Sequence, residues 1–107
     1  MKRGEIWWVN FNPSVGGEPQ KVRPAVIVSN DASNANINRV QVVPLTSRTE
    51  RVYACEALVT AGGQKSKALA SQVTTAAKER LTKKLGKLSA ADMRQVEQAV
   101  MVQLGLG

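Results

Sequence analysis

Short apolar runs separated by polar segments make up most of this chain, and they predict β-strands. The expected strands span residues 5–11, 26–28, 39–45, 52–59 and 67–73. Polar or glycine-rich loops and turns are expected between them, at 14–22, 30–38, 46–51 and 60–63. A short helical turn is expected at 78–84. The run at 26–28 is apolar at every position, which is typical of a strand buried on both faces.

The end of the chain changes to a helical pattern. Ser89 and Asp92 have the spacing of an N-terminal capping box, and Gly105 is a suitable C-terminal stop. Between them a single apolar stripe is formed by Met93, Val96, Val100 and Leu104. We therefore expect one mainly β domain of the α+β class over residues 1–107, a small antiparallel β-barrel or half-open sheet closed by a C-terminal helix.

Composition narrows the function. The 107 residues carry 15 basic and 8 acidic side chains, for a formal charge of +7, which favours a polyanionic partner. There is no histidine, and the single Cys55 cannot form an internal disulfide, so we expect a reducing compartment and no metal site. No apolar run approaches the roughly 20 residues that span a bilayer, and the charged start of the chain lacks the pattern of a signal peptide. We expect a cytoplasmic protein with no membrane association.

Two polar residues stand at the ends of apolar runs, where a core does not require them. Arg23 precedes Pro24 at the start of one run, and Thr46 follows the Pro44-Leu45 pair at the end of another. A guanidinium fork matches two phosphate oxygens, and a hydroxyl can donate to a third. The alternative is an ordinary surface arginine and a threonine that completes a turn.

Several motifs, in this order and spacing, resemble the MazF/PemK/Kid toxins. The segments that carry the resemblance are RGEIW (3–7), NP (12–13), RPA (23–25), PLTS (44–47), ASQV (70–73) and LGL (104–106). The resemblance covers nearly the whole chain. It implies an SH3-like barrel and a homodimeric, metal-independent endoribonuclease that needs no cofactor. It also implies that single-stranded RNA is cut at short sequences and that a cognate antitoxin, acidic and partly disordered, inhibits the toxin. In this family Arg23 and Thr46 match the catalytic arginine and its hydroxyl partner.

Residues near this pair are candidates for binding RNA. They are mostly polar loop residues, and we expect contacts from Glu18, Gln20, Lys21, Ser47, Arg48, Arg51 and Gln72. Trp8 or Tyr53 could stack on a base. Arginine is a poor base, so the proton of the attacking 2′-OH must go elsewhere. Glu18, a backbone carbonyl and a water molecule remain open as that base.

Two other functions are consistent with parts of the pattern. A CcdB-like toxin, which shares this kind of fold, binds gyrase through an aromatic C-terminal helix, whereas this chain ends in QLGLG. A non-catalytic RNA-binding or protein-binding member of the family is the second alternative. It is suggested by Ser71 and Thr74, which stand where many relatives have charged residues.

Overall fold

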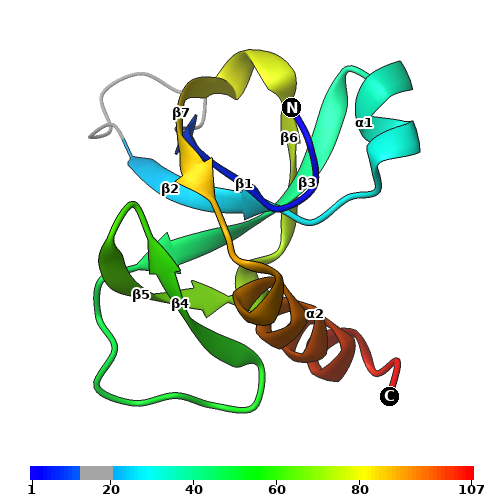
Figure 1. Ribbon diagram of the computed structural model, residues 1–107. Helices are drawn as coiled ribbons and strands as arrows, with labels where there is room; N and C mark the ends of the chain where they lie inside the picture. The colour runs from blue at the N-terminus through cyan, green and yellow to red at the C-terminus, as the bar shows by residue number, and fades with distance from the viewer. Residues whose placement is uncertain (13–20) are drawn as a thin grey trace.

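The computed structural model describes residues 1–12 and 21–107, and β-strands dominate this part of the chain (Figure 1). The strands are β1 (Glu5–Asn10), β2 (Val22–Ile27), β3 (Arg39–Thr46), β4 (Glu56–Ala61), β5 (Gln64–Leu69), β6 (Thr74–Ala77) and β7 (Leu81–Lys87). The helices are α1 (Asp31–Asn36) and α2 (Ala90–Leu104), and two short 3-10 turns are η1 (Ala70–Gln72) and η2 (Lys78–Arg80). The predicted mainly β fold with a C-terminal helix is confirmed.

β3 organises the sheet, because it pairs with three other strands. The order is β4-β5-β3-β2-β1-β7, with β6 also on β3, and every pairing is antiparallel. Residues 39–42 of β3 pair with β6, residues 42–44 with β2, and residues 45–46 with β5. The sheet therefore changes direction along β3 and curls into a half-open barrel (Figure 1).

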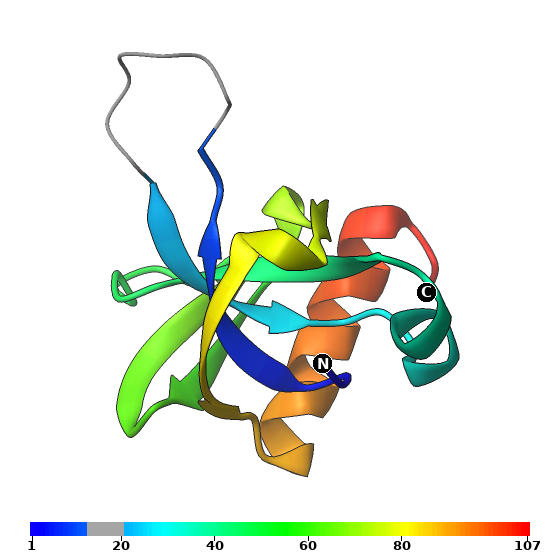
Figure 2. The ribbon, with the colours of Figure 1, turned by 90° about the horizontal axis from the view of Figure 1, so that it is seen from above.

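Two apolar clusters hold this curled sheet together. One lies between α2 and the sheet and includes Ile6, Val43 and Val96, all fully buried. The other includes Val9 and Ile27 and lies on the opposite side of β1 and β2. Each such side chain stabilises the fold by about 1.5–3 kcal/mol through burial. Figure 2 shows α2 running along the sheet, where it covers the first cluster.

The predicted C-terminal helix is confirmed in its position and its caps. Ser89 Oγ accepts the backbone N–H of Asp92 at 3.1 Å, and Gly105 ends the helix at φ 70°. The predicted capping box is only half formed. The Asp92 carboxylate accepts the backbone N–H of Thr60 at 2.8 Å and so ties α2 to β4. Leu104, predicted in the apolar stripe, is 53% exposed, because the helix extends past the sheet there.

Several strand boundaries differ from the sequence prediction. β2 begins at Val22 instead of residue 26, because residues 22–26 pair with β1. β4 begins at Glu56 and β5 at Gln64, on either side of the predicted glycine turn. Gly62 and Gly63 both have positive φ there, as a tight two-residue hairpin requires.

Two other predictions were wrong in the type of structure. The segment 30–38, expected as a loop, contains α1, because the Asn30 side chain accepts the N–H of Ser33 at 2.8 Å and caps a helix. In the segment 78–84 only η2 is helical, and β7 follows from Leu81. β7 forms because its backbone pairs with β1, although its sequence is rich in lysine.

Candidate nucleic-acid interface

The candidate site lies where β2 and β3 separate. Their ladder contains Ile27–Val42, Val26–Val43 and Ala25–Pro44, and it ends there. Pro24 and Pro44 have no N–H and cannot donate hydrogen bonds that would extend it. Beyond Pro44, β3 pairs with β5 instead, through Leu45 and Thr46. The start of β2 and the end of β3 are thereby free to line a hollow.

The first hollow has a volume of about 550 Å³. Arg23 enters it from β2, and Thr46 and Ser47 enter it from the end of β3. The structure therefore brings together the two residues predicted to be catalytic. Trp8 of β1 adds an aromatic wall, as one of the two stacking residues suggested by the sequence. Tyr53, the other, is not among the described residues that line either of the hollows at Arg23.

A second hollow of about 360 Å³ adjoins the first. Its lining consists of Phe11, Lys21, Arg23, Pro44 and Gln72. Arg23 lines both hollows and thus stands between them. We call the two hollows together the Arg23 groove. On one side of Arg23 lie Trp8 and the polar residues of the first hollow, and on the other side lie Lys21 and the amide of Gln72.

Arg23 is exposed and available for an anion. Among the described residues, no ion pair or side-chain hydrogen bond involves its guanidinium. The linings of the Arg23 groove, as far as they are described, contain no carboxylate that would compete with a bound phosphate. An exposed arginine surrounded by neutral and basic groups favours anion binding by charge and by geometry.

The Thr46 side chain already makes one hydrogen bond. Its Oγ1 accepts the backbone N–H of Arg48 at 3.2 Å, which is the turn-completing role that the sequence left as an alternative. This bond occupies an oxygen lone pair and leaves the hydroxyl hydrogen available. Thr46 is partly buried at the groove, so the hydrogen can be donated to a bound group.

The predicted RNA-binding residues divide into three sets. Lys21, Ser47 and Gln72 line the Arg23 groove. Arg48 and Arg51 lie on the connection between β3 and β4, and neither is among the described lining residues. Glu18 and Gln20 are outside the described residues.

Sequence reasoning missed three polar or aromatic residues among the described lining of the groove. Gln64 and Ser66 line the first hollow from β5, and Phe11 lines the second. Placing the start of the strand at residue 67 left Gln64 and Ser66 outside it, because residues 64–67 are polar at every position. The Gly62-Gly63 pair was the available signal, since a two-residue glycine turn makes the next residue the first of a hairpin strand. Phe11 was assigned to a strand, but its position directly before Asn12-Pro13 also marks a strand end, where side chains reach a rim.

The carboxylates with shifted pKa values are engaged elsewhere. Burial raises the pKa of Glu5, but hydrogen bonds from Trp7, the Lys2 N–H and Lys84 outweigh it and lower the pKa to about 2. The N–H of Arg3 and the side chain of Asn34 lower the pKa of Asp31. These groups stabilise the fold and do not line the Arg23 groove.

Two further observations concern metal and membrane. In residues 1–12 and 21–107, no three His, Cys, Asp or Glu side chains are grouped so that they could hold a metal ion. Within the same residues, no helix has the length and apolar character needed to cross a membrane.

A half-open antiparallel barrel with an arginine and a threonine at one groove defines the class of protein, a small β-barrel with a basic groove. More specifically, the chain belongs to the family of PemK-like, MazF-like toxins of type II toxin–antitoxin systems, whose model matches residues 2–104. The resemblance stated from the motifs is thus confirmed.

Several proteins are similar to this chain over nearly its whole length. Endoribonuclease MazF9 of Mycobacterium tuberculosis is 42% identical over 115 residues, which cover 99% of this chain and 98% of that protein. A mycobacterial endoribonuclease solved in complex with its cognate antitoxin has a TM-score of 0.85 at 25% identity, covering 100% of this chain and 97% of the other. The MazE–MazF structure (Form-II) from Deinococcus radiodurans also has a TM-score of 0.85, at 28% identity, with coverage of 100% and 97%.

Proposed function

We propose that this protein is an endoribonuclease toxin that cleaves single-stranded RNA without a metal ion, and that a cognate antitoxin inhibits it. One observation carries the proposal: Arg23 and Thr46, from two strands that separate at Pro24 and Pro44, line one hollow of a basic groove. The proposal is also supported by the family and by full-length similarity to a protein named as an endoribonuclease.

The chemistry follows from the groups in the groove. The 2′-oxygen of a nucleotide attacks the adjacent phosphorus, the bond from phosphorus to the 5′-oxygen breaks, and a 2′,3′-cyclic phosphate and a 5′-hydroxyl result. Negative charge grows on the non-bridging oxygens in the transition state. The Arg23 guanidinium donates two hydrogen bonds to these oxygens, and the Thr46 hydroxyl donates a third.

The proton transfers need other groups. The 2′-OH loses a proton to a base, and the 5′-oxygen gains one. Neither a carboxylate nor a histidine is among the described lining residues. Glu18, the base candidate from the sequence, is outside the described residues, so a water molecule or a backbone carbonyl remains an equal alternative.

The Arg23 groove has the groups to hold a strand that continues beyond the reacting phosphate. Trp8 in the first hollow and Phe11 in the second offer aromatic surfaces for bases. Gln64 and Gln72 offer amides that can pair with base edges, and Lys21 offers a charge for a neighbouring phosphate. A single strand fits this arrangement better than a duplex, because its bases are free to turn toward both walls.

The partners follow from the same surface. An acidic segment of an antitoxin would compete with RNA for Arg23 and Lys21, because both ligands are polyanions. Solved relatives are described as complexes of toxin and antitoxin. We further propose a homodimer in the cytoplasm; exposed Val102 and Leu104 at the end of α2 are apolar surface that a second copy would cover.

Incubation of the purified protein with a long single-stranded RNA in EDTA tests this function. Discrete fragments with 2′,3′-cyclic phosphate ends are expected, and addition of the cognate antitoxin should stop their formation. Intact RNA would contradict the proposal. RNA bound but uncut would favour the non-catalytic alternative, and inhibited DNA supercoiling with intact RNA would favour the gyrase-binding one.

A further inference from the structure

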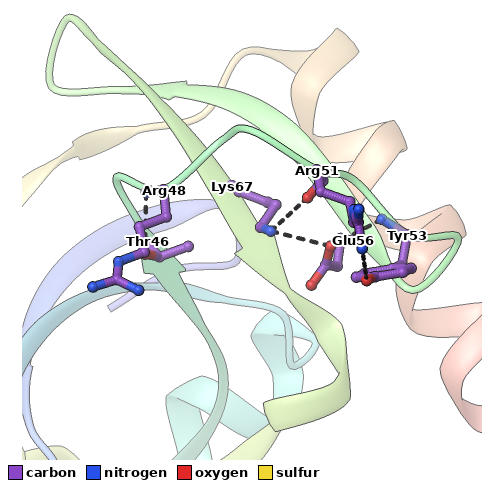
Figure 3. Close-up of polar contacts among 6 residues, drawn as sticks. All are labelled: Thr46, Arg48, Arg51, Tyr53, Glu56 and Lys67. Atoms are coloured by element: carbon purple, nitrogen blue, oxygen red, sulfur yellow. Dashed lines mark hydrogen bonds and ion pairs between the residues drawn. The ribbon is translucent and has the colours of Figure 1, made fainter.

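Lys67 is buried, although lysine side chains are rarely found inside small domains. It lies in the middle of β5, where it is the direct cross-strand partner of Thr46 on β3. The residue is only 9% exposed. The connection 47–55, which follows Thr46 and leads to β4, folds over it (Figure 3).

The Lys67 ammonium is held by two partners, one from this connection and one from the start of β4. Its Nζ donates to the backbone carbonyl of Arg51 at 2.7 Å and lies 3.2 Å from Glu56 Oε1. Glu56 Oε1 also accepts the backbone N–H of Tyr53 at 2.9 Å. The side chains of Lys67 and Glu56 are 11% and 10% exposed, so these contacts are largely shielded from water.

Such a pair is better suited to fixing a position than to adding stability. Removing two charges from water costs several kcal/mol, and their attraction often only offsets that cost. The pair instead fixes the geometry of the connection. Residues 47–53 form no helix or strand, and their backbone is held at Arg51 by Lys67 and at Tyr53 by Glu56. The Tyr53 N–H and Lys67 lower the pKa of Glu56, which keeps its carboxylate ionised.

The other end of the same connection reaches the Arg23 groove. Ser47 lines the first hollow, and the Arg48 N–H donates to Thr46 Oγ1. In Figure 3 the Arg48 guanidinium extends on the Thr46 side of Lys67, whereas Arg51 and Tyr53 lie on the other side. The Arg51 guanidinium donates to the Tyr53 hydroxyl at 3.2 Å, which holds it within the connection.

We propose that Lys67 is a positioning residue for substrate binding: by fixing the connection 47–55 against β5 and Glu56, it holds Arg48 beside Thr46, where Arg48 binds an RNA phosphate next to the one bound by Arg23. This inference rests on the proposed RNA cleavage. It assigns Arg48 to the substrate and Arg51 to the internal structure of the connection.

The test compares three variants with the wild type on a short single-stranded RNA in EDTA. Lys67→Met keeps most of the unbranched side chain and removes the ammonium, and Glu56→Gln removes the opposite charge. Lys65→Met is the matched control, because Lys65 lies on the same face of β5 two residues earlier and is exposed. Each protein is measured for KM, for kcat and for hydrogen exchange of the amides in residues 47–55.

Loss of a phosphate contact that is equal in the ground and transition states raises KM and leaves kcat unchanged. We expect Lys67→Met to raise KM about tenfold, with a shallower salt dependence and kcat within about twofold of the wild type. Exchange should quicken within 47–55 and not in β1 or β2. Glu56→Gln should change KM in the same direction by a smaller factor, and Lys65→Met should match the wild type.

Two results would overturn the inference. One is a wild-type KM in Lys67→Met or, if that variant does not fold, in Glu56→Gln. The other is a lower kcat at constant KM with faster exchange throughout the protein, which indicates only a smaller folded fraction. If the wild type itself leaves RNA intact, the proposed function fails, and hydrogen exchange still reports whether Lys67 holds the connection.

Discussion

Thr46 Oγ1 accepts the backbone N–H of Arg48 at 3.2 Å (Figure 3), so this hydroxyl has its hydrogen left to donate. A hydroxyl that accepts one hydrogen bond becomes a somewhat stronger donor through polarisation. The turn that follows β3 therefore holds Thr46 Oγ1 without using its hydrogen, so the structural role of this residue is compatible with its proposed catalytic role.

Thr46→Val tests this relationship, because valine has the shape of threonine without the hydroxyl. We expect the single-turnover rate of RNA cleavage to fall by about 10- to 100-fold, the effect of losing one donor to the transition state. Thr46→Ser retains the hydroxyl and should stay within a few-fold of the wild type. Equal rates for Thr46→Val and the wild type would assign this residue to the turn alone.

Lys21 should contribute to binding without taking part in the chemistry. It lines the second hollow beside Arg23 and Gln72. We expect Lys21→Ala to raise KM at unchanged kcat and to reduce the slope of log KM against log salt by about 1, the value for one lost phosphate contact. Lys87→Ala, an exposed residue at the end of β7, is the control. An unchanged salt slope for Lys21→Ala would show that no phosphate lies there.

Glu5 should make stability depend on pH in the acid range. Its carboxylate accepts the Trp7 indole N–H at 2.9 Å and pairs with Lys84 at 3.1 Å. Because the folded-state pKa is lowered from 4.5 to about 2, the stabilisation is complete above pH 4.5 and is lost as the pH falls toward 2.

Urea unfolding of the wild type and Glu5→Gln at several pH values checks this expectation. The variant should be less stable at neutral pH by on the order of 1 to 2 kcal/mol. The difference should shrink below pH 4.5 and be lost as the pH falls through the folded-state pKa of about 2, because the Glu5 carboxyl is then protonated and uncharged like the glutamine. A difference that stays constant across this range would mean that the Glu5 charge is not involved.

Elements with strong local signals were predicted well from the sequence. α2 combines a capping residue, an apolar stripe and a terminal glycine, and Ser89 and Gly105 perform the expected roles. β7 was missed because its lysines resemble a solvent-exposed turn. Its identity as a strand comes from pairing with β1, a residue range far away in the chain, and on an edge strand lysines are tolerated.

In the candidate site, too, residues with a local sequence signal were predicted and residues placed by distant contacts were not. Arg23 and Thr46 stand out locally, since each is a polar residue at the end of an apolar run that contains a proline, and the fold brings them into one hollow. Lys67 could not be recognised, because a lysine in a polar strand normally faces water. Its burial depends on the connection 47–55 folding over β5, and its partner Glu56 lies on a different strand. Local patterns do not contain that information.

The account depends most directly on Arg23 as the group that stabilises the reacting phosphate. The decisive measurement is the single-turnover rate of RNA cleavage in EDTA for Arg23→Ala, with Arg39→Ala as a matched control that removes an equal charge from an exposed position on β3. We predict a loss of at least about 100-fold for Arg23→Ala, an unchanged urea midpoint, and wild-type cleavage by Arg39→Ala. Cleavage by folded Arg23→Ala at the wild-type rate would contradict the account.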